Sequence, residues 1–160
     1  MLIYLCGRKN CGKTTLCDEL IKRNYTKVSF ADKLKESISY LYGVEINSLS
    51  NPIFKETQLD NPWKWNSEIF NKLKQYLKIK ASLEIKDRVF NTPRECLQYI
   101  GTDILRAIDT DFHLKYAIKK IKYLIKQGKN ICLDDVRFIN EKKSLDSDNS
   151  FICQEPKNDI

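Results

Sequence analysis

The chain contains the sequence Gly7-Arg8-Lys9-Asn10-Cys11-Gly12-Lys13-Thr14 directly after the apolar run Leu2–Cys6. A short uncharged run that ends at a glycine is typical of a buried strand followed by a tight turn. Apolar residues then recur at helical spacing from Leu16 to Ile21, which predicts a helix over 14–22. The stretch therefore predicts a strand, a glycine turn and a helix in immediate succession.

The turn matches the pattern Gly-x-x-x-x-Gly-Lys-Ser/Thr, in which backbone N–H groups wrap the phosphates of a nucleoside triphosphate. We expect Lys13 to contact the β- and γ-phosphates and the Thr14 hydroxyl to reach Mg²⁺. The positive end of the following helix adds to the attraction. The alternative is a glycine turn without a ligand. The predicted ATP phosphate-binding residues are Gly7, Lys9, Asn10, Cys11, Gly12, Lys13, Thr14 and Thr15.

Length and composition predict one folded domain. The chain has 160 residues, of which 42% are hydrophobic and 31% charged, so the composition typical of disordered chains is excluded. Its apolar runs fall short of the roughly 20 residues that a membrane span needs. The first residues also lack the basic and apolar regions of a secretory signal. We therefore expect a cytoplasmic protein without a membrane partner.

The net charge of +7 invites a nucleic-acid interpretation, which we do not favour. The lysines are spread through amphipathic segments, where solvated lysines are common, and no basic-aromatic cluster matches a known nucleic-acid module. A positive field still attracts phosphorylated small molecules.

Six cysteines raise the question of a disulfide or zinc framework. The chain is long for a disulfide scaffold, and it contains neither a Cys-x-x-Cys pair nor more than one histidine. We expect reduced cysteines that mostly pack in the core, with Cys11 as the exception because of its place in the turn.

Further elements follow from periodicity and from turn residues. Thr92-Pro93-Arg94-Glu95 is a capping box with proline at the first helical position, which predicts a helix start. Gly101 is a candidate break in that helix. The other expected elements are a strand over 28–30, a helix over 31–42 that Gly43 ends, an irregular segment over 44–65, a helix from Ser67, a helix over 114–125 with Gly128 after it, a strand over 130–133, a helical stretch over 140–145 and a strand over 151–153.

This alternation predicts the three-layer α/β fold of P-loop NTPases. Short uncharged strands separated by helices favour a parallel sheet of four to five strands with helices on both faces. We expect a single domain over 1–160, with a helical, substrate-covering insert at 44–90.

Polar residues next to these elements are candidates for a site. Asp32 lies at a strand-to-helix junction, where ligands bind in such sheets, although a carboxylate there also stabilises a helix without any ligand. Arg94 and Gln98 lie one helical turn apart. Arginine binds phosphate bidentately and glutamine reads a base edge. The alternative for this pair is a solvated helix face.

The predicted strand 130–133 runs into Asp134, Asp135 and Arg137. This is the placement of an acid that holds the metal and its water shell near Thr14. The two aspartates point to opposite faces if the strand continues, so one of them faces the metal. Arg137 is then placed to hold a phosphate, and the alternative is a plain turn at the strand end.

Taken together, these motifs resemble the deoxynucleoside monophosphate kinases of bacteriophages and other large DNA viruses. The resemblance rests on the turn, on Phe30-Ala31-Asp32-Lys33-Leu34-Lys35, on the capping box with Leu97-Gln98 and Gly101-Thr102, and on Asp135-Val136-Arg137-Phe138 with Asn140-Glu141.

The resemblance implies transfer of the γ-phosphate of ATP to a deoxynucleoside monophosphate, giving the diphosphate and ADP, with Mg²⁺ as cofactor and a viral protein in the host cytoplasm. It implies catalytic roles for Lys13, Arg94 and Arg137, and metal binding by Thr14 and Asp135. The implied acceptor-binding residues are Asp32, Lys33, Arg94, Gln98 and Arg137.

Relatives of this kind continue past the fourth strand into a lid that commonly carries arginines, whereas no arginine follows Arg137 here. Two alternatives therefore stay open beside the kinase. The protein is either a catalytically weak or inactive kinase-derived binding or assembly protein, or a kinase for another phosphorylated small metabolite. Whether the protein forms a homodimer also stays open.

Overall fold

The structure is a computed structural model that describes residues 1–6, 12–136 and 151–154. Its contacts divide the chain into two compact units, Met1–Phe30 together with Leu114–Ile160, and Ala31–His113. The single domain with an insert at 44–90 stays a prediction. The stretch expected to be helical at 140–145 lies outside the described residues.

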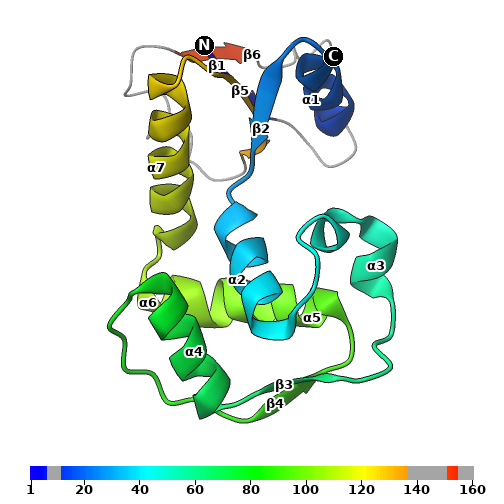
Figure 1. Ribbon diagram of the computed structural model, residues 1–160, viewed down its shortest axis with the longest axis vertical. Helices are drawn as coiled ribbons and strands as arrows, with labels where there is room; N and C mark the ends of the chain where they lie inside the picture. Colours follow the sequence, from blue (N-terminus) through cyan, green and yellow to red (C-terminus); the bar gives the residue numbers. More distant parts are fainter. Residues whose placement is uncertain (7–11, 137–150, 155–160) are drawn as a thin grey trace, which may run out of the picture. The chain divides into compact units, whose positions relative to one another are not determined.

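The first unit contains a parallel sheet flanked by helices (Figure 1). Its four strands lie in the order β2-β5-β1-β6, and each neighbouring pair is parallel. The α/β class and the parallel sheet are thereby confirmed. The elements of this unit are β1 (Leu2–Cys6), α1 (Lys13–Lys22), β2 (Tyr25–Val28), α7 (Phe112–Lys126), β5 (Asn130–Val136) and β6 (Phe151–Gln154).

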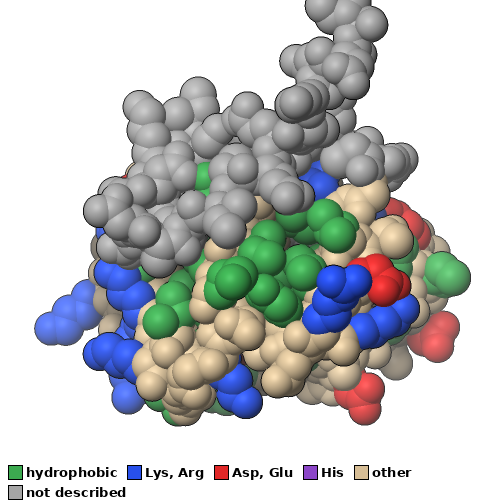
Figure 2. Space-filling model, turned by 90° about the horizontal axis from the view of Figure 1, so that it is seen from above, with side chains coloured by type: hydrophobic (Ala, Val, Ile, Leu, Met, Phe, Trp, Pro, Cys, Tyr) green, Lys and Arg blue, Asp and Glu red, His purple; other side chains and the backbone are tan. Residues whose placement is uncertain are grey.

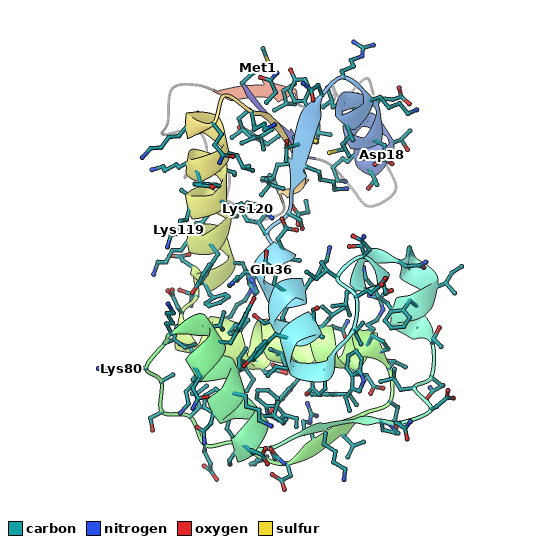
Figure 3. All side chains as sticks on the ribbon, viewed as in Figure 1. Met1, Asp18, Glu36, Lys80, Lys119 and Lys120 are labelled. Atoms are coloured by element: carbon teal, nitrogen blue, oxygen red, sulfur yellow. The ribbon has the colours of Figure 1, made fainter. Side chains whose placement is uncertain are left out.

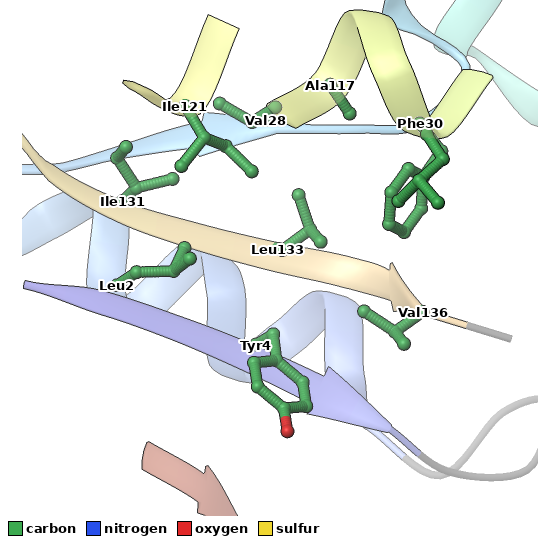
Figure 4. Packing of buried hydrophobic residues seen from close by; sticks show 10 residues of the cluster. Leu2, Tyr4, Val28, Phe30, Ala117, Ile121, Ile131, Leu133 and Val136 are labelled. Atoms are coloured by element: carbon green, nitrogen blue, oxygen red, sulfur yellow. The ribbon is translucent and has the colours of Figure 1, made fainter. Parts of the chain in front are cut away.

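Helices cover both faces of this sheet because its inner strands β1 and β5 carry apolar residues on both sides. On one face Leu2 and Leu133 pack with Ile121 of α7 (Figure 4). On the other face Cys132 packs with Leu5 and with Cys17 of α1. Alternate residues of a strand point to opposite faces, so each strand supplies both layers.

Two strand boundaries differ from the prediction. β2 covers Tyr25–Val28 instead of 28–30, because this edge strand tolerates polar residues on its exposed side. β5 continues to Val136 because its pairing with β1 extends to Cys6, whereas its pairing with β2 ends at Leu133. From Leu133 to Val136, β5 advances by three residues, whereas the paired stretch of β1 from Tyr4 to Cys6 advances by two. This bulge returns Val136 to the face of Leu133.

The second unit is mostly helical and includes an antiparallel strand pair. The helices over 32–42 and 67–77 confirm their predictions, and Gly43 ends the first with φ of 68°. The pair β3–β4 and the short helices in 44–65 were not predicted. The elements are α2 (Asp32–Tyr42), η1 (Ser48–Ser50), α3 (Pro52–Glu56), β3 (Trp63–Trp65), α4 (Ser67–Leu77), β4 (Arg88–Phe90), α5 (Pro93–Gln98), η2 (Tyr99–Leu105) and α6 (Arg106–Ile108).

The predicted capping box begins α5. Thr92 Oγ1 accepts a hydrogen bond from Glu95 N at 3.3 Å. Glu95 Oε2 accepts from Asn91 N at 2.8 Å, one residue before the position that a standard capping box uses. The start of the helix is therefore fixed by its own sequence.

The helix does not break at Gly101 but widens into the π-helix η2. The Gly101 carbonyl lies 3.0 Å from Nε2 of the buried His113. A Cβ atom at Gly101 would stand 2.8 Å from Leu34 Cδ2. Glycine is thus needed here for the close approach of the helix to α2.

We expect Gly101→Ala to lower the free energy of unfolding by about 1–3 kcal/mol, because the added methyl overpacks a buried contact. Urea denaturation measures this change. The exposed neighbour Thr102 provides the control, since Thr102→Ala should stay within about 0.5 kcal/mol of the wild type. Equal denaturation midpoints for Gly101→Ala and the wild type would contradict the packing argument.

The cysteine prediction is confirmed where side chains are described. Cys17, Cys96 and Cys132 are buried and reduced, whereas the side chains of Cys6, Cys11 and Cys153 lie outside the described set. Burial raises the pKa of the Cys96 thiol and outweighs a hydrogen bond with Tyr42. Cys96 therefore stays protonated, which is the unreactive form.

Alkylation tests this burial. We expect iodoacetamide at neutral pH to leave Cys17, Cys96 and Cys132 unmodified in the native protein and to modify all three in denaturant, because only an exposed thiolate reacts. Peptide mass spectrometry identifies the modified positions. Rapid modification of Cys96 without denaturant would show that the core around α5 is open.

Among the helices of the described ranges, none is both long and apolar enough to cross a membrane.

Candidate functional site

The first part of the candidate site is the start of α1. Gly12 precedes the helix with φ of 85°, a left-handed conformation that suits glycine. Its carbonyl accepts a hydrogen bond from Leu16 N at 3.0 Å. Lys13 and Thr14 are the first two helical residues. Their backbone N–H groups belong to the first turn, which has no acceptor within the helix.

The predicted residues at this end of α1 differ in exposure. Lys13 is half-buried, and Thr14 and Thr15 are exposed. The predicted residues Gly7, Lys9, Asn10 and Cys11 lie outside the described residues. On the face of the molecule seen in Figure 2, lysine and arginine side chains lie beside a group of hydrophobic ones.

The second part is the carboxylate of Asp135 near the end of β5. Asp135 Oδ2 accepts hydrogen bonds from Ser29 Oγ at 2.6 Å and from Phe30 N at 3.1 Å. Val28 of β2 pairs with Leu133 of β5, so these contacts join the two chain segments just beyond their last paired residues. Hydrogen bonds to a charged acceptor are stronger than neutral ones. The side chain of Asp134 and all of Arg137 lie outside the described part of the chain.

The start of α2 carries Asp32 and Lys33. Asp32 is the first residue of the helix and is half-buried, which fits both interpretations that the sequence left open. Lys33 Nζ lies 3.1 Å from Glu36 Oε2 and 4.6 Å from the centre of the Tyr76 ring, and Figure 3 labels Glu36 on α2. Partial burial acts to lower the pKa of Lys33, but Glu36 and Tyr76 outweigh it and the pKa is raised. Lys33 is therefore a charged residue held on the surface of its own unit.

Arg94 on α5 makes an ion pair with Glu56 of α3, in which Nε donates to Oε1. The two side chains are 44% and 60% exposed. An exposed pair of this kind contributes about 0–1 kcal/mol, so an anionic ligand can replace Glu56 at little cost.

Gln98 lies one helical turn after Arg94 and lines a hollow of about 260 Å³. The hollow is open to solvent and is lined by α5, η2 and strand β4, all within the second unit. Arg94 is not part of its lining. The residues around it are Arg88, Val89, Phe90, Glu95, Gln98, Tyr99 and Asp103.

Comparison with known proteins gives one curated relative. Over 108 residues the chain is 32% identical to a protein of Acanthamoeba polyphaga mimivirus named "Putative deoxynucleotide monophosphate kinase". The match covers 66% of this chain and 42% of the relative, so the chain spans less than half the length of that protein. No protein-family model matches the chain. The chain is thus similar to part of a protein named as a putative kinase.

Of the seven residues around the hollow, sequence analysis predicted only Gln98 as a site residue. Arg88, Tyr99 and Asp103 were not predicted as site residues. Glu95, Tyr99 and Asp103 recur every four residues, which places them along one helix face, and this spacing was the available signal. Arg88 offered no such signal because it lies on a three-residue strand.

The donor set of the first unit fits a magnesium ion in its chemistry. Mg²⁺ prefers oxygen ligands and is usually held by one or two protein oxygens, phosphate oxygens and several waters. The Thr14 hydroxyl and the Asp135 carboxylate are such oxygens. Within the described residues no group of three or more His, Cys, Asp and Glu is placed to hold a metal by itself, and a phosphate-bound Mg²⁺ does not need one.

Proposed function

We propose that this protein transfers the γ-phosphoryl group of ATP to a deoxynucleoside monophosphate. The observation that carries the proposal is the start of α1, where a left-handed Gly12 leads straight into a helix that begins with Lys13 and Thr14. This helix follows β1, an inner strand of the parallel sheet. The likeness to a protein named as a kinase supports the same assignment.

On the donor side, we assign the binding of the ATP phosphates to the glycine turn before α1 and to the first helical turn of α1. The backbone N–H groups there and the positive helix end bind the anion. Lys13 neutralises charge on the β- and γ-phosphates as it builds up during transfer. No covalent intermediate is required, because phosphoryl transfer depends on positioning and charge stabilisation.

Mg²⁺ is the proposed cofactor, and Thr14 and Asp135 are the residues that would hold it. When bound, it supplies charge neutralisation at the phosphates. The contacts of Asp135 with Ser29 and Phe30 hold its carboxylate in one orientation. The protein's part is thus to fix the direction of an oxygen ligand in advance.

On the acceptor side, the proposal assigns the monophosphate to Arg94 and Arg137, with Asp32 and Lys33 at the start of α2. Arginine matches a phosphate bidentately. In this proposal Arg94 exchanges its weak partner Glu56 for the phosphate of the substrate, which adds an oriented contact at the cost of a solvent-exposed one.

A panel of the four deoxynucleoside monophosphates, each with ATP and Mg²⁺, tests the proposal through ADP release. We expect release that depends on a deoxynucleoside monophosphate. Nucleotide binding without ADP release would favour a kinase-derived binding protein instead. ADP release only with other phosphorylated metabolites would support the assignment of the ATP site and show that the acceptor is a different metabolite.

A further inference from the structure

The hollow beside Gln98 is lined by charged, amide and aromatic side chains. Its volume of about 260 Å³ lies just below the range of pockets that take whole drug-sized ligands, so it suits one base better than a complete nucleotide. Its position one turn beyond Arg94 is suitable for a base whose phosphate Arg94 binds, and to that extent the inference rests on the proposed function.

One wall of the hollow is rigid. The Tyr99 ring contacts two buried aromatic residues, with centroid distances of 6.0 Å to Trp65 and 5.7 Å to Phe90. The Arg88 guanidinium lies 4.4 Å from the centre of the Tyr99 ring, a cation–π contact. Arg88 is also next to Trp65 across the β3–β4 pair. An otherwise exposed arginine is thus held against the Tyr99 ring in the lining of the hollow.

The helical part of the lining, to which Tyr99 belongs, also carries acceptors. Glu95, Tyr99 and Asp103 lie along it at intervals of four residues, and the π-helix η2 contains the last two. Such widened turns occur often at functional sites. Glu95 already accepts a hydrogen bond from Asn91 N, whereas Asp103 is an exposed carboxylate at the hollow.

We propose that this hollow selects guanine, with Asp103 as the specificity-determining residue and Arg88 as its partner. Guanine presents two adjacent donors, N1–H and the N2 amino group, to a carboxylate, and two acceptors, O6 and N7, to an arginine. Adenine presents an acceptor at N1 where the carboxylate needs a donor. Thymine offers a single N–H between two carbonyl oxygens, and cytosine offers an acceptor at N3. Each of these places an acceptor against the Asp103 carboxylate, which disfavours the complex.

Isothermal titration of the full chain with dGMP, dAMP, dCMP and dTMP, without ATP, tests the proposal. We expect dGMP to bind most tightly. Asp103→Asn should weaken dGMP binding by about 10- to 100-fold, since hydrogen bonds to a charged group are lost, and should leave dTMP binding nearly unchanged. Asp60→Asn changes an exposed aspartate of the same unit outside the hollow, and this control should keep the preference for dGMP.

The outcomes separate this inference from the kinase proposal. Equal binding of the four nucleotides, no binding of dGMP, or an equal loss of all four in Asp103→Asn would overturn the guanine site. ADP release without preference for dGMP would overturn it as well and leave the kinase in place. Guanine-selective binding without ADP release would keep the site and overturn the kinase. Circular dichroism melting of each variant shows that it is folded.

Discussion

We expect Lys13→Ala to lower turnover by about 10²–10³-fold, the scale found when one oriented charged or hydrogen-bonding donor is removed from a transition state. Lys13 is the first residue of α1, directly after the left-handed Gly12. Its ammonium group would bear on charge that develops at the transferred phosphoryl group, so the main loss should be in kcat. A coupled assay of ADP release measures it.

Lys22 offers the matched control on the same helix. It lies in the last turn of α1 and forms an exposed ion pair with Glu19. An exposed pair contributes little, so Lys22→Ala should keep the wild-type rate. If Lys13→Ala also keeps that rate, Lys13 has no part in the reaction, and the assignment of the donor side fails.

The second large effect is expected at Arg94. We expect Arg94→Ala to lower kcat/KM for the monophosphate by about 10²-fold, because in our proposal the bound substrate buries the Arg94–phosphate pair, and truncating one partner of a buried hydrogen-bonded charge pair costs about 2–5 kcal/mol. Arg94→Lys should recover only part of this, since lysine keeps the charge and loses the bidentate fork. The KM for ATP should change little, because α5 is not part of the predicted donor site.

A substitution of Glu56 tests whether Arg94 acts on the substrate or only holds the structure. Glu56 holds Arg94 in the structure, so in our proposal it competes with the substrate phosphate. Glu56→Gln should therefore leave KM for the monophosphate unchanged or lower it slightly. A rise in KM as large as that of Arg94→Ala would mean that the ion pair itself supports the acceptor site, and that Arg94 acts by holding the structure.

Sequence predicts those elements whose causes are local. The helix starts at Lys13 and Pro93 follow from a glycine turn and a capping box, each contained in a few neighbouring residues. β1 and the segment 131–133 of β5 are apolar on both faces and therefore easy to recognise. The boundary of β2 was wrong because this edge strand includes the polar residues Thr26 and Lys27.

The missed features depend on partners far away in the chain. The three-residue strands β3 and β4 are too short for a periodic pattern, and only their pairing defines them. The π-helix at Gly101 depends on contacts with Leu34 and His113. The candidate site also depends on distant partners. Neither the ion pair between Arg94 and Glu56 nor the hydrogen bond from Ser29 to Asp135 has a signal in the local sequence.

The order of the strands also governs how the protein can be built during synthesis. β1 and β2 do not pair with each other, because β5 lies between them in the sheet. β5 lies more than a hundred residues after β1 in the sequence. Contacts this distant form slowly. The uninterrupted segment Ala31–His113 leaves the ribosome complete before β5 does. We infer that it folds first during translation, and that the sheet of the other unit is completed only after β5 has been synthesised.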